Sequence, residues 1–518
     1  MVLGMAACGA KEEPAQPKTE EPKTEEKKEE PKTEEKKEEP AKEVKYKEHI
    51  TVAENAQISS MNPYQGGNSN EQHDRLFLNV YNTLVFYNSA TKEIEPELAT
   101  EWTWADDLKS ITFKLRDDVY FHNGEKMTSK DVAFSMTALE SAGQYPYIDH
   151  IETPDDTTVT FYLNQVNTEF INLLCYYTAV VVNEKAYTED EEKGFIIGTG
   201  PWMIDWDNCL AGDTTELIRN DNYWGEKPVA KKMTLKFFNN ASSRLIALQN
   251  GDVDIAYAIS TNEYDLANSD ENIELYQYQG TGLRYVAFNT KEGPGADENL
   301  RHCIACLVNR EDDMIAIGDP TAVETNTLFG WTTTGYNGGF ADTENDYNVE
   351  LAKEYLAKSQ YKEIEFMVNN GSAYYPIAEL LQEEAREIGL TITFKEVDGA
   401  GLSANSKYAT PQFEALVYSC SMRDYNSDID RLLAVGKNSN KSIVNDPEIT
   451  QLLADGVGTT DAAKVKEIYG KVQQIVRDKA YYVPVYYGGG SYAYTKGLTG
   501  IKYDATNRHD WGYAAIEE

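Results

Sequence analysis

Hydrophobic and polar positions alternate with two different periods along most of the chain. From Ile50 onward, short segments that alternate apolar and polar residues are interleaved with segments of helical periodicity, a pattern typical of an α/β protein. Ile111 to Leu115 alternates as a strand. Thr128 to Asp131 carries the residue types of a helix start, which predicts a helix over Val132 to Ser141.

The N-terminal segment shows neither period. Residues 9–45 consist mainly of Glu, Lys, Pro and Thr, and Pro22 to Glu30 is repeated directly as Pro31 to Glu39. The repeat has no aromatic or β-branched aliphatic side chain with which to build a core. We therefore expect residues 9–45 to form a disordered linker with a root-mean-square span on the order of 30 Å. The folded body is expected to begin at residue 46.

Small residues precede the first cysteine. Met5-Ala6-Ala7-Cys8-Gly9 resembles the lipobox that directs a diacylglycerol group onto a cysteine thiol, with Met5 where Leu, Val or Ile is usual. This resemblance implies that residues 1–8 are the remainder of a lipoprotein signal and that lipidated Cys8 anchors the protein to the outer face of the cytoplasmic membrane. The alternative is an unmodified cysteine before a plain disordered tail.

Length and charge narrow the class of protein. A chain of 518 residues is long enough for two large lobes with separate cores. The 86 acidic residues outnumber the 48 basic ones, and the resulting net charge of -38 excludes nucleic-acid binding because such a surface repels phosphate backbones. The same charge is compatible with a cationic or zwitterionic ligand.

The cysteines and histidines do not predict a metal centre or a cofactor. Cys303 and Cys306 have C-x-x-C spacing, which also occurs in redox and metal sites, but they lie in a predicted helical stretch, Leu300 to Val308, without a second such pair. We interpret them as buried apolar residues. The six histidines are scattered without ligand spacing, and His122 fits a structural turn.

Longer motifs occur in a fixed order along the body. They are Glu97 to Trp102, Ile111 to Val119, Phe121 to Val132, Gly198 to Trp202, Arg219 to Gly225, Leu248 to Asp254, Val286 to Asn289, Asn299 to Arg301, Val308 to Arg310 and Tyr482 to Tyr487. This series resembles the signature of family 5 extracellular solute-binding proteins of ABC transporters, the peptide and nickel-binding type.

The resemblance implies a two-lobed, periplasmic-binding-protein-like α/β fold of the type II, cluster C-like kind. Lobe I would comprise residues 46–279 and 480–518, with residues 79–198 as an extra subdomain, and lobe II residues 280–479. Extended segments at Gln277 to Thr281 and Lys479 to Tyr482 would form the hinge.

The implied function is delivery of a solute, with peptides favoured, from an interlobe cleft to the permease subunits of an ABC importer by a monomeric protein. The loop from Ser421 to Ser427 is similar to the family loop whose aspartate pairs with the α-ammonium of a peptide, which assigns that role to Asp424. A carboxylate in a cleft that excludes water gains from a charge-assisted bond to an ammonium group. The alternative for Asp424 is a solvated turn residue.

Further ligand contacts follow from the same resemblance. Arg423 and Tyr425 flank the predicted amine selector, and the family places cleft-lining aromatics near the crossovers, here Tyr285 and Tyr487. Tyr257 and Asn62 are weaker candidates on the same resemblance. For any single tyrosine, packing in a core or on the surface is the alternative. Met422 and Arg423 stand where the family has a tryptophan, so a metal chelate, an oligosaccharide or a sensing role stays open.

A membrane-anchored hydrolase is the alternative from another class. The chain contains no G-x-S-x-G, H-E-x-x-H or P-loop motif, and Gly488 to Gly490 lacks the Lys-Ser/Thr partner of a phosphate loop. We therefore predict a binding protein and not an enzyme.

Overall fold

The computed structural model describes residues 44–58, 60–64, 71–88, 91, 93–141, 147–330, 333, 336, 338–340, 346–422, 426–502 and 510–517. The chain divides into two units, Met1–Val44 and Lys45–Glu518, and the second is the folded body. The predicted lipidation site Cys8, and the predicted linker up to residue 43, lie outside the described residues.

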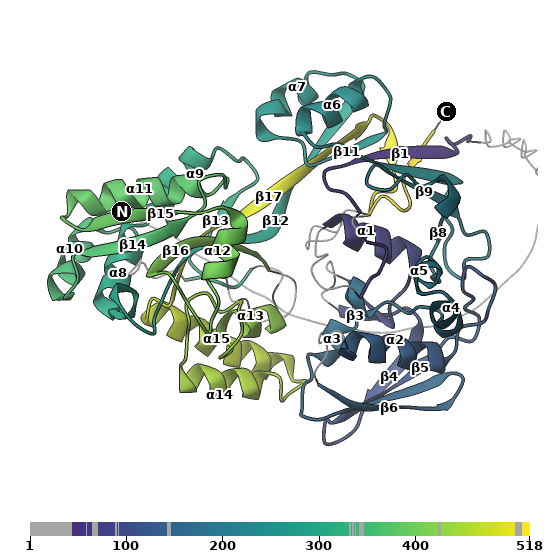
Figure 1. Cartoon of the computed structure of the whole chain (residues 1–518), viewed down its shortest axis with the longest axis horizontal. Helices are drawn as coiled ribbons and strands as arrows, with labels where there is room; N and C mark the ends of the chain where they lie inside the picture. Colours follow the sequence, from purple (N-terminus) through teal and green to yellow (C-terminus); the bar gives the residue numbers. More distant parts are fainter. Residues whose placement is uncertain are drawn as a thin grey trace, which may run out of the picture. The chain divides into compact units, whose positions relative to one another are not determined.

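One large sheet runs through the folded body (Figure 1). Its strand order is β15-β14-β16-β12-β17-β11-β1-β10-β9-β8, with β13 also paired to β17. The strands are β1 (His49–Glu54), β8 (Trp202–Ile204), β9 (Thr214–Arg219), β10 (Lys232–Phe237), β11 (Ile255–Tyr257), β12 (Ile273–Phe288), β13 (Val323–Glu324), β14 (Glu363–Val368), β15 (Thr391–Glu396), β16 (Ala415–Ser421) and β17 (Tyr482–Thr495).

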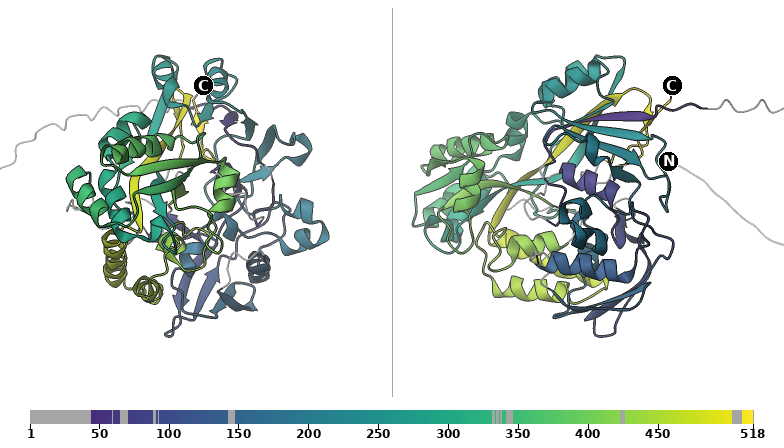
Figure 2. Two further views of the ribbon diagram at one scale, coloured as in Figure 1. Left: turned by 60° about the vertical axis from the view of Figure 1, so that its left-hand side comes forward. Right: turned by 45° about the vertical axis from the view of Figure 1, so that its right-hand side comes forward.

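The two long strands β12 and β17 connect two halves of the body. They pair antiparallel over most of their length, and Figures 1 and 2 show them running side by side between two groups of helices. At one end β12 pairs with β16, and at the other β17 pairs with β11. We call the half that contains β1, β8, β9, β10 and β11 lobe I, and the half that contains β13, β14, β15 and β16 lobe II.

Each lobe has its own cores. In lobe I the larger core lies under α1 (Glu71–Val80), and a smaller one lies between the sheet and the helices α6 (Ala241–Gln249) and α7 (Tyr264–Asn268). The two cores of lobe II lie on opposite faces of the lobe II strands. Along β17, Tyr482, Val485 and Tyr487 pack in lobe II cores and Tyr492 packs in lobe I. The change of core in β17 thus falls between Tyr487 and Tyr492, later in the chain than the hinge segment expected at 479–482. The predicted lobe boundaries as a whole stay a proposal.

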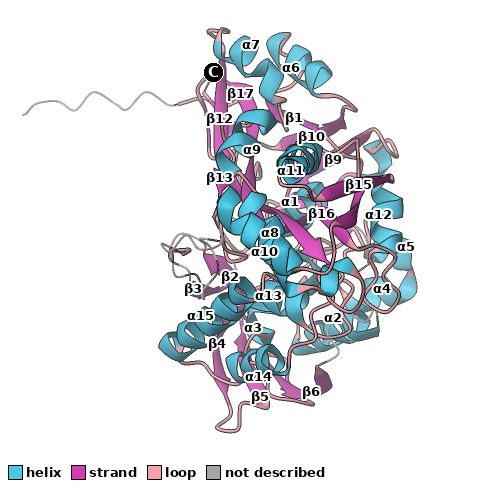
Figure 3. Cartoon of the chain, turned by 90° about the vertical axis from the view of Figure 1, so that its left-hand side faces the viewer, coloured by secondary structure: helices cyan, strands magenta, loops and turns pink. Residues whose placement is uncertain are grey.

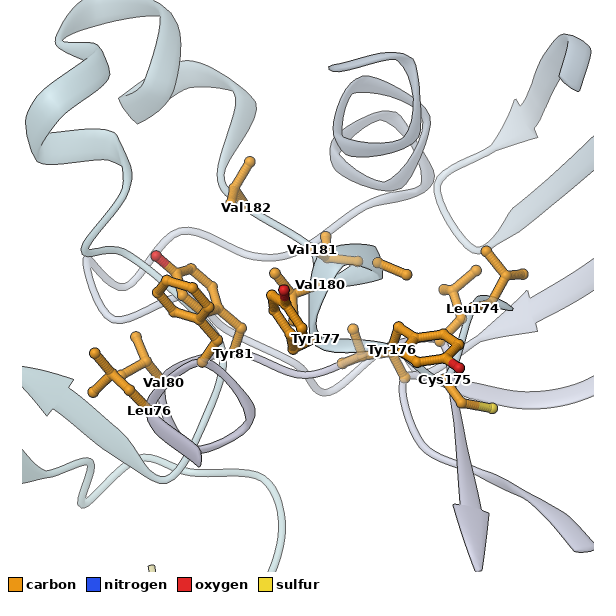
Figure 4. Close-up of a cluster of buried hydrophobic side chains, with 14 of the residues drawn as sticks. Leu76, Val80, Tyr81, Leu174, Cys175, Tyr176, Tyr177, Val180, Val181 and Val182 are labelled. Carbon is orange, nitrogen blue, oxygen red and sulfur yellow. The ribbon is translucent and has the colours of Figure 1, made fainter. Parts of the chain in front are cut away.

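Part of the lobe I core is shown in Figure 4. Leu76, Val80 and Tyr81, at the end of α1, lie near the segment from Leu174 to Val182, and all of these residues except Thr178 are buried. Phe77 stacks on Tyr177 with ring centroids 5.9 Å apart. This contact holds the first helix of lobe I against the chain that leaves the extra subdomain.

The extra subdomain contains two small sheets. One has the order β4-β5-β7-β6 and the other pairs β2 with β3, and the strands are β2 (Val85–Asn88), β3 (Glu93–Pro96), β4 (Ala99–Trp104), β5 (Ser110–Leu115), β6 (Ile148–Asp155) and β7 (Thr158–Leu163). The strand predicted from Ile111 is confirmed as β5. The predicted helix is confirmed as α2 (Ser129–Ser141), and it begins three residues early because Thr128 donates from N and Oγ1 to Asp131 Oδ2 at 2.9 Å and closes the first turn.

The remaining elements are mostly helices that cover the sheet, as Figure 3 shows for lobe II. In lobe I they are α1 (Glu71–Val80), α3 (Phe170–Leu173), α4 (Glu184–Glu189), α5 (Glu191–Gly194), α6 (Ala241–Gln249) and α7 (Tyr264–Asn268). In lobe II they are α8 (Glu298–Leu307), α9 (Arg310–Ile317), α10 (Val349–Lys358), α11 (Tyr375–Glu387), α12 (Gly399–Asn405), α13 (Asn426–Leu433), α14 (Pro447–Gly456) and α15 (Ala462–Asp478). Short strands β18 (Leu498–Thr499) and β19 (Ala515–Ile516) pair near the C-terminus, and 3-10 helices cover Tyr177–Ala179, Trp206–Asn208, Thr261–Glu263 and Pro294–Ala296.

Two sequence interpretations concern single residues, and both are confirmed. Cys303 and Cys306 lie in α8 with fully buried thiols, and burial raises their pKa values to about 12 and about 11. His122 has a structural role: Gly198 N donates to its Nδ1, so Nε2 carries the proton and donates to Gly200 O at 3.0 Å. Burial lowers the pKa of His122 to about 4, which keeps the ring neutral.

Neither a membrane-spanning helix nor a metal cluster occurs in the described ranges. There, every helix is too short or too polar to cross a bilayer. In the same ranges, three or more His, Cys, Asp or Glu side chains nowhere come together in an arrangement that could hold a metal ion.

Candidate functional site

The carboxyl edge of the lobe II strands has the topology of a ligand crevice. β14 is parallel to both β15 and β16, so the three strands end at the same edge. β14 lies between the other two, and the chain leaves it first for β15 through α11 and then crosses to β16 through α12. In open α/β sheets, ligands bind outside the carboxyl ends of the strands where the connections diverge in this way.

The loop with the predicted amine selector begins and ends at this edge. Met422, directly after β16, donates from its backbone N to Thr281 O at 2.9 Å, and Asn426 starts α13. Arg423, Asp424 and Tyr425 themselves lie outside the described residues. Their ligand roles stay predictions.

Lobe I has a cavity at the corresponding edge of its own strands. β1 is parallel to β10 and β11, so the three strands end at the same edge of the sheet, with Glu54, Phe237 and Tyr257 as their last residues. Next to it lies a cavity of about 1020 Å³, lined by Glu54 at the end of β1, residues 56–58 and 60–62 after it, Trp206 and residues 209–215 before and at the start of β9, and the end of β10, together with Glu191 and Phe195. A cavity of this size is large enough for a small-molecule ligand.

Asn62 is the predicted contact that lines this cavity. Ser60 Oγ accepts from Asn62 N at 3.1 Å, and Asn62 Oδ1 accepts from Tyr64 N at 2.8 Å. These two bonds fix the turn, so the position of Asn62 is set before any ligand arrives. Its ligand role stays a prediction.

The three predicted tyrosines lie in the cores. Tyr257 packs under the guanidinium of Arg75, 3.9 Å from the ring centroid. Tyr285 packs edge-on against Tyr482 in lobe II, and Tyr487 donates from its hydroxyl to Leu328 O at 2.8 Å. All three side chains are buried. The structure therefore does not gather them with Asn62 around one cavity, and their ligand roles stay predictions.

The lobes also touch at a place remote from β12 and β17. Thr168, just before α3 in lobe I, donates from N to Val457 O at 2.8 Å and from Oγ1 to Thr459 O at 3.0 Å. Beside it, Asn426 donates from Nδ2 to Glu169 Oε1 at 3.4 Å. The residue that follows the predicted ligand loop thus contacts the other lobe directly.

An acidic group is buried at this contact. The pKa of Asp430, on α13, is raised to about 8: burial is the largest cause, the carboxylates of Glu169 and Asp428 also raise it, and the bond from the Tyr469 hydroxyl at 2.8 Å opposes the shift. Burial raises the pKa of Tyr147 in lobe I, and the charge of Asp430 raises it further. At neutral pH Asp430 is therefore protonated and adds no negative charge to those of Glu169 and Asp428 at this contact.

We expect the contact to weaken in alkaline solution. Because the pKa of Asp430 is raised by folding, its stabilising effect is complete below the unfolded value of 3.8 and is lost as the pH rises through about 8. Small-angle scattering from pH 6 to 9.5 should show the radius of gyration increasing in the wild type and staying constant in Asp430→Asn. Glu467→Gln, on the exposed side of α15, is the control; an equal increase in all three proteins would contradict the expectation.

With the fold and this edge described, the comparison with known proteins is decisive. The model of bacterial extracellular solute-binding proteins, family 5, middle region, matches residues 93–440. The chain belongs to this family. As a family 5 protein it is an extracytoplasmic solute-binding component of an ABC transporter, and it is a binding protein and not an enzyme.

Relatives of this family 5 protein bind different solutes. It is 26% identical over 455 residues to heme-binding protein A of Haemophilus influenzae, covering 79% of this chain and 82% of the relative. It is 23% identical over 504 residues to the dipeptide-binding protein of Escherichia coli, covering 87% and 91%.

Solved structures share its fold. CtaP of Listeria monocytogenes has a TM-score of 0.81 at 22% identity over 92% of this chain and 100% of the other. DppA of Helicobacter pylori in complex with the peptide STSA has 0.75 at 22% over 91% and 98%, and NikA of Brucella suis in complex with Fe(III)-EDTA has 0.80 at 18% over 90% and 100%. The predicted periplasmic-binding-protein fold with an extra sheet subdomain is thereby confirmed.

Sequence reasoning did not single out Arg284, Tyr374 and Tyr418 at the lobe II edge of this family 5 protein. Arg284 lies in β12 between two buried residues, Leu283 and Tyr285. A charged residue within the otherwise apolar stretch from Leu283 to Phe288 was the available signal.

Proposed function

We propose that this solute-binding protein binds peptides, from dipeptides to oligopeptides, and delivers them to the permease subunits of an ABC importer. The observation that carries the proposal is the position of Met422 and Asn426, the two described residues that flank residues 423–425, at the carboxyl edge where the lobe II connections diverge. The dipeptide-binding relative and the fold neighbour that holds the peptide STSA support a peptide as the solute.

In this proposal Asp424 binds the α-ammonium group of the peptide, with Arg423 and Tyr425 beside it and Asn62 contacting the solute from lobe I. The ligand contacts both lobes and so favours the closed form, which the permease recognises. In this proposal Tyr257, Tyr285 and Tyr487, which are buried in the cores, support the walls of the site from behind.

Replacing Asp424 tests the proposal. Asp424→Ala should weaken binding of the peptide STSA by about 2 to 5 kcal/mol, because a buried ammonium group then lacks its partner. N-acetylated STSA should bind the wild type and the variant equally poorly. Titration calorimetry measures both, with the exposed Glu387→Ala as the control. Unchanged affinity of Asp424→Ala for STSA would remove Asp424 from the site.

Two other solute classes would replace peptides if the test fails. A metal chelate is favoured by the neighbour that holds Fe(III)-EDTA, and an oligosaccharide or a sensing role remained open from the sequence. Mass spectrometry of the solutes released by denaturing the purified protein separates these classes. A catalytic product among them would bring back the hydrolase that the sequence disfavoured.

We also propose that Cys8 is lipidated and that residues 9–45 tether the body at the outer face of the cytoplasmic membrane. The lipobox-like sequence and the repeated Glu/Lys segment support this proposal. Full-length protein is expected in the membrane fraction, and Cys8→Ser in the soluble fraction. Membrane retention of Cys8→Ser after a high-salt wash would contradict it.

A further inference from the structure

Arg284 brings a positive charge without an acidic partner to the lobe II edge. Within the described residues its guanidinium makes no hydrogen bond and no ion pair, and its Nε is buried. The side chain as a whole is only half-buried, so the terminal nitrogens stay accessible. In a chain with a net charge of -38, an arginine that lacks a carboxylate partner requires an explanation.

Two glycines make room for the guanidinium. Gly282 and Gly488 are register partners where β12 and β17 pass between the lobes. A Cβ on Gly282 would lie 2.5 Å from Nη1 of Arg284, and a Cβ on Gly488 would lie 3.2 Å from Nη2. The guanidinium therefore folds back along the strands toward the junction of the lobes, over a surface that only glycine leaves open.

Aromatic rings flank the cation. The guanidinium carbon lies 5.8 Å from the ring centroid of Tyr374, directly before α11, and 5.7 Å from that of Tyr486. Such rings stabilise a cation and exclude water from its sides, while leaving the planar edge with its N–H donors free.

A second cation lies near the same strands. Lys441 is buried, donates from Nζ to Ser406 O and Oγ, and lies 4.8 Å from the ring centroid of Tyr418 on β16. It makes no ion pair with any acidic group that the structure describes. The acidic groups near Tyr486 are Asp313, Asp319 and its register partner Glu324, and none of them bonds to Arg284. Within the described residues, neither cation is therefore neutralised by a bonded carboxylate.

We propose that Arg284 binds a carboxylate group of the solute. A planar guanidinium with accessible paired N–H groups matches the two oxygens of a carboxylate, and the flanking rings strengthen the bond by lowering the local dielectric. The bond from Met422 N to Thr281 O places Met422, two residues before Asp424 in the sequence, beside the start of this part of β12. The carboxylate proposal rests on the proposed solute-binding function, and together with Asp424 it predicts recognition of a zwitterion at both charged groups.

The test compares STSA with its C-terminal amide, which lacks only the carboxylate, and adds a carboxylate probe of another kind. Titration calorimetry would use STSA, its C-terminal amide, and Fe(III)-EDTA, which has carboxylates and no ammonium group. Arg284→Gln should weaken binding of each carboxylate probe by about tenfold or more, as expected for a lost hydrogen bond to a charged group. The variant should not weaken binding of the amide. Arg386→Gln, an exposed arginine on α11, is the matched control, and circular dichroism shows whether Arg284→Gln is folded.

The outcomes separate this proposal from the peptide proposal. Loss of Fe(III)-EDTA binding in Arg284→Gln, when STSA binds neither protein, would support the carboxylate site and refute the peptide function. Equal affinity of wild type and Arg284→Gln for every carboxylate probe that binds would overturn the role of Arg284 and leave the peptide function standing. A wild type that binds none of the carboxylate probes would also overturn it.

Discussion

Replacing Arg75 by methionine is expected to lower the free energy of unfolding of lobe I by about 3 to 5 kcal/mol. Arg75, on α1, forms an ion pair with Glu54 at the end of β1, with Nη2 to Oε2 at 2.5 Å and Nε to Oε1 at 3.2 Å. The side chains are only 1% and 4% exposed. Trp511 also donates from Nε1 to Glu54 Oε1 at 3.3 Å. Without the arginine, the buried carboxyl group of Glu54 loses its ionic partner in an environment with little water to solvate it.

Tryptophan fluorescence during urea unfolding measures this change selectively. Six of the seven tryptophans lie in lobe I segments, at positions 102, 104, 202, 206, 224 and 511, so the signal reports mainly that lobe. Lys231→Met is the control, because Lys231 and Glu48 form a pair that is 57% and 67% exposed and is expected to contribute under about 1 kcal/mol. The double variant Arg75→Met/Glu54→Gln should recover part of the loss. A single variant as stable as the wild type would show that the pair is not needed.

The fold could be predicted from local patterns and ordered motifs. β5 and α2 follow from alternation and capping residues that lie within a few positions of each other. His122 shows why the motifs stay together: its ring links Phe121 to Val132 with Gly198 to Trp202, so two segments far apart in sequence form one structural unit. A resemblance that includes both segments therefore carries the fold with it.

The change of core in β17 could not be predicted in the same way. The strand alternates its side chains between two faces, and it does so equally in lobe II at Tyr487 and in lobe I at Tyr492. Gly488 to Gly490 lie at this place in the sequence, but glycines alone do not show where one core ends. The pairing with β11, which begins at Tyr492, decides the position, and it is a contact over more than 200 residues of sequence.

The candidate site was only partly accessible from sequence, for a related reason. A tyrosine has the same apolar ring and hydroxyl in a core and in a cleft, so the burial of Tyr257, Tyr285 and Tyr487 could not be foreseen. The contact between Glu169 and Asn426 spans 257 positions. Arg284 stands out only once its neighbours are known, because the absence of an acidic partner is a property of the packed structure.

Arg301 in lobe II gives the second large expected effect. Its guanidinium, in α8, is almost fully buried, and it donates to four backbone carbonyls: Lys479 O and Ala480 O after α15, and Gly295 O and Ala296 O before α8. Burial lowers the pKa of Arg301, with Glu298 opposing the shift. Arg301→Leu would leave these carbonyls unpaired, which should lower the free energy of unfolding of lobe II by about 3 to 5 kcal/mol.

Hydrogen exchange locates the effect of Arg301→Leu. Amides of residues 479–487, where α15 leads into β17, should exchange faster, while lobe I amides in β1 and β10 keep their protection. The exposed Arg386→Leu is the control. Because β17 carries the lobe II packing to the junction of the lobes, the variant should also weaken solute binding although Arg301 is remote from the proposed ligand contacts. Slow exchange throughout residues 479–487 in Arg301→Leu would show that the carbonyls find other partners, and that this buried arginine does not hold the second crossover strand in place.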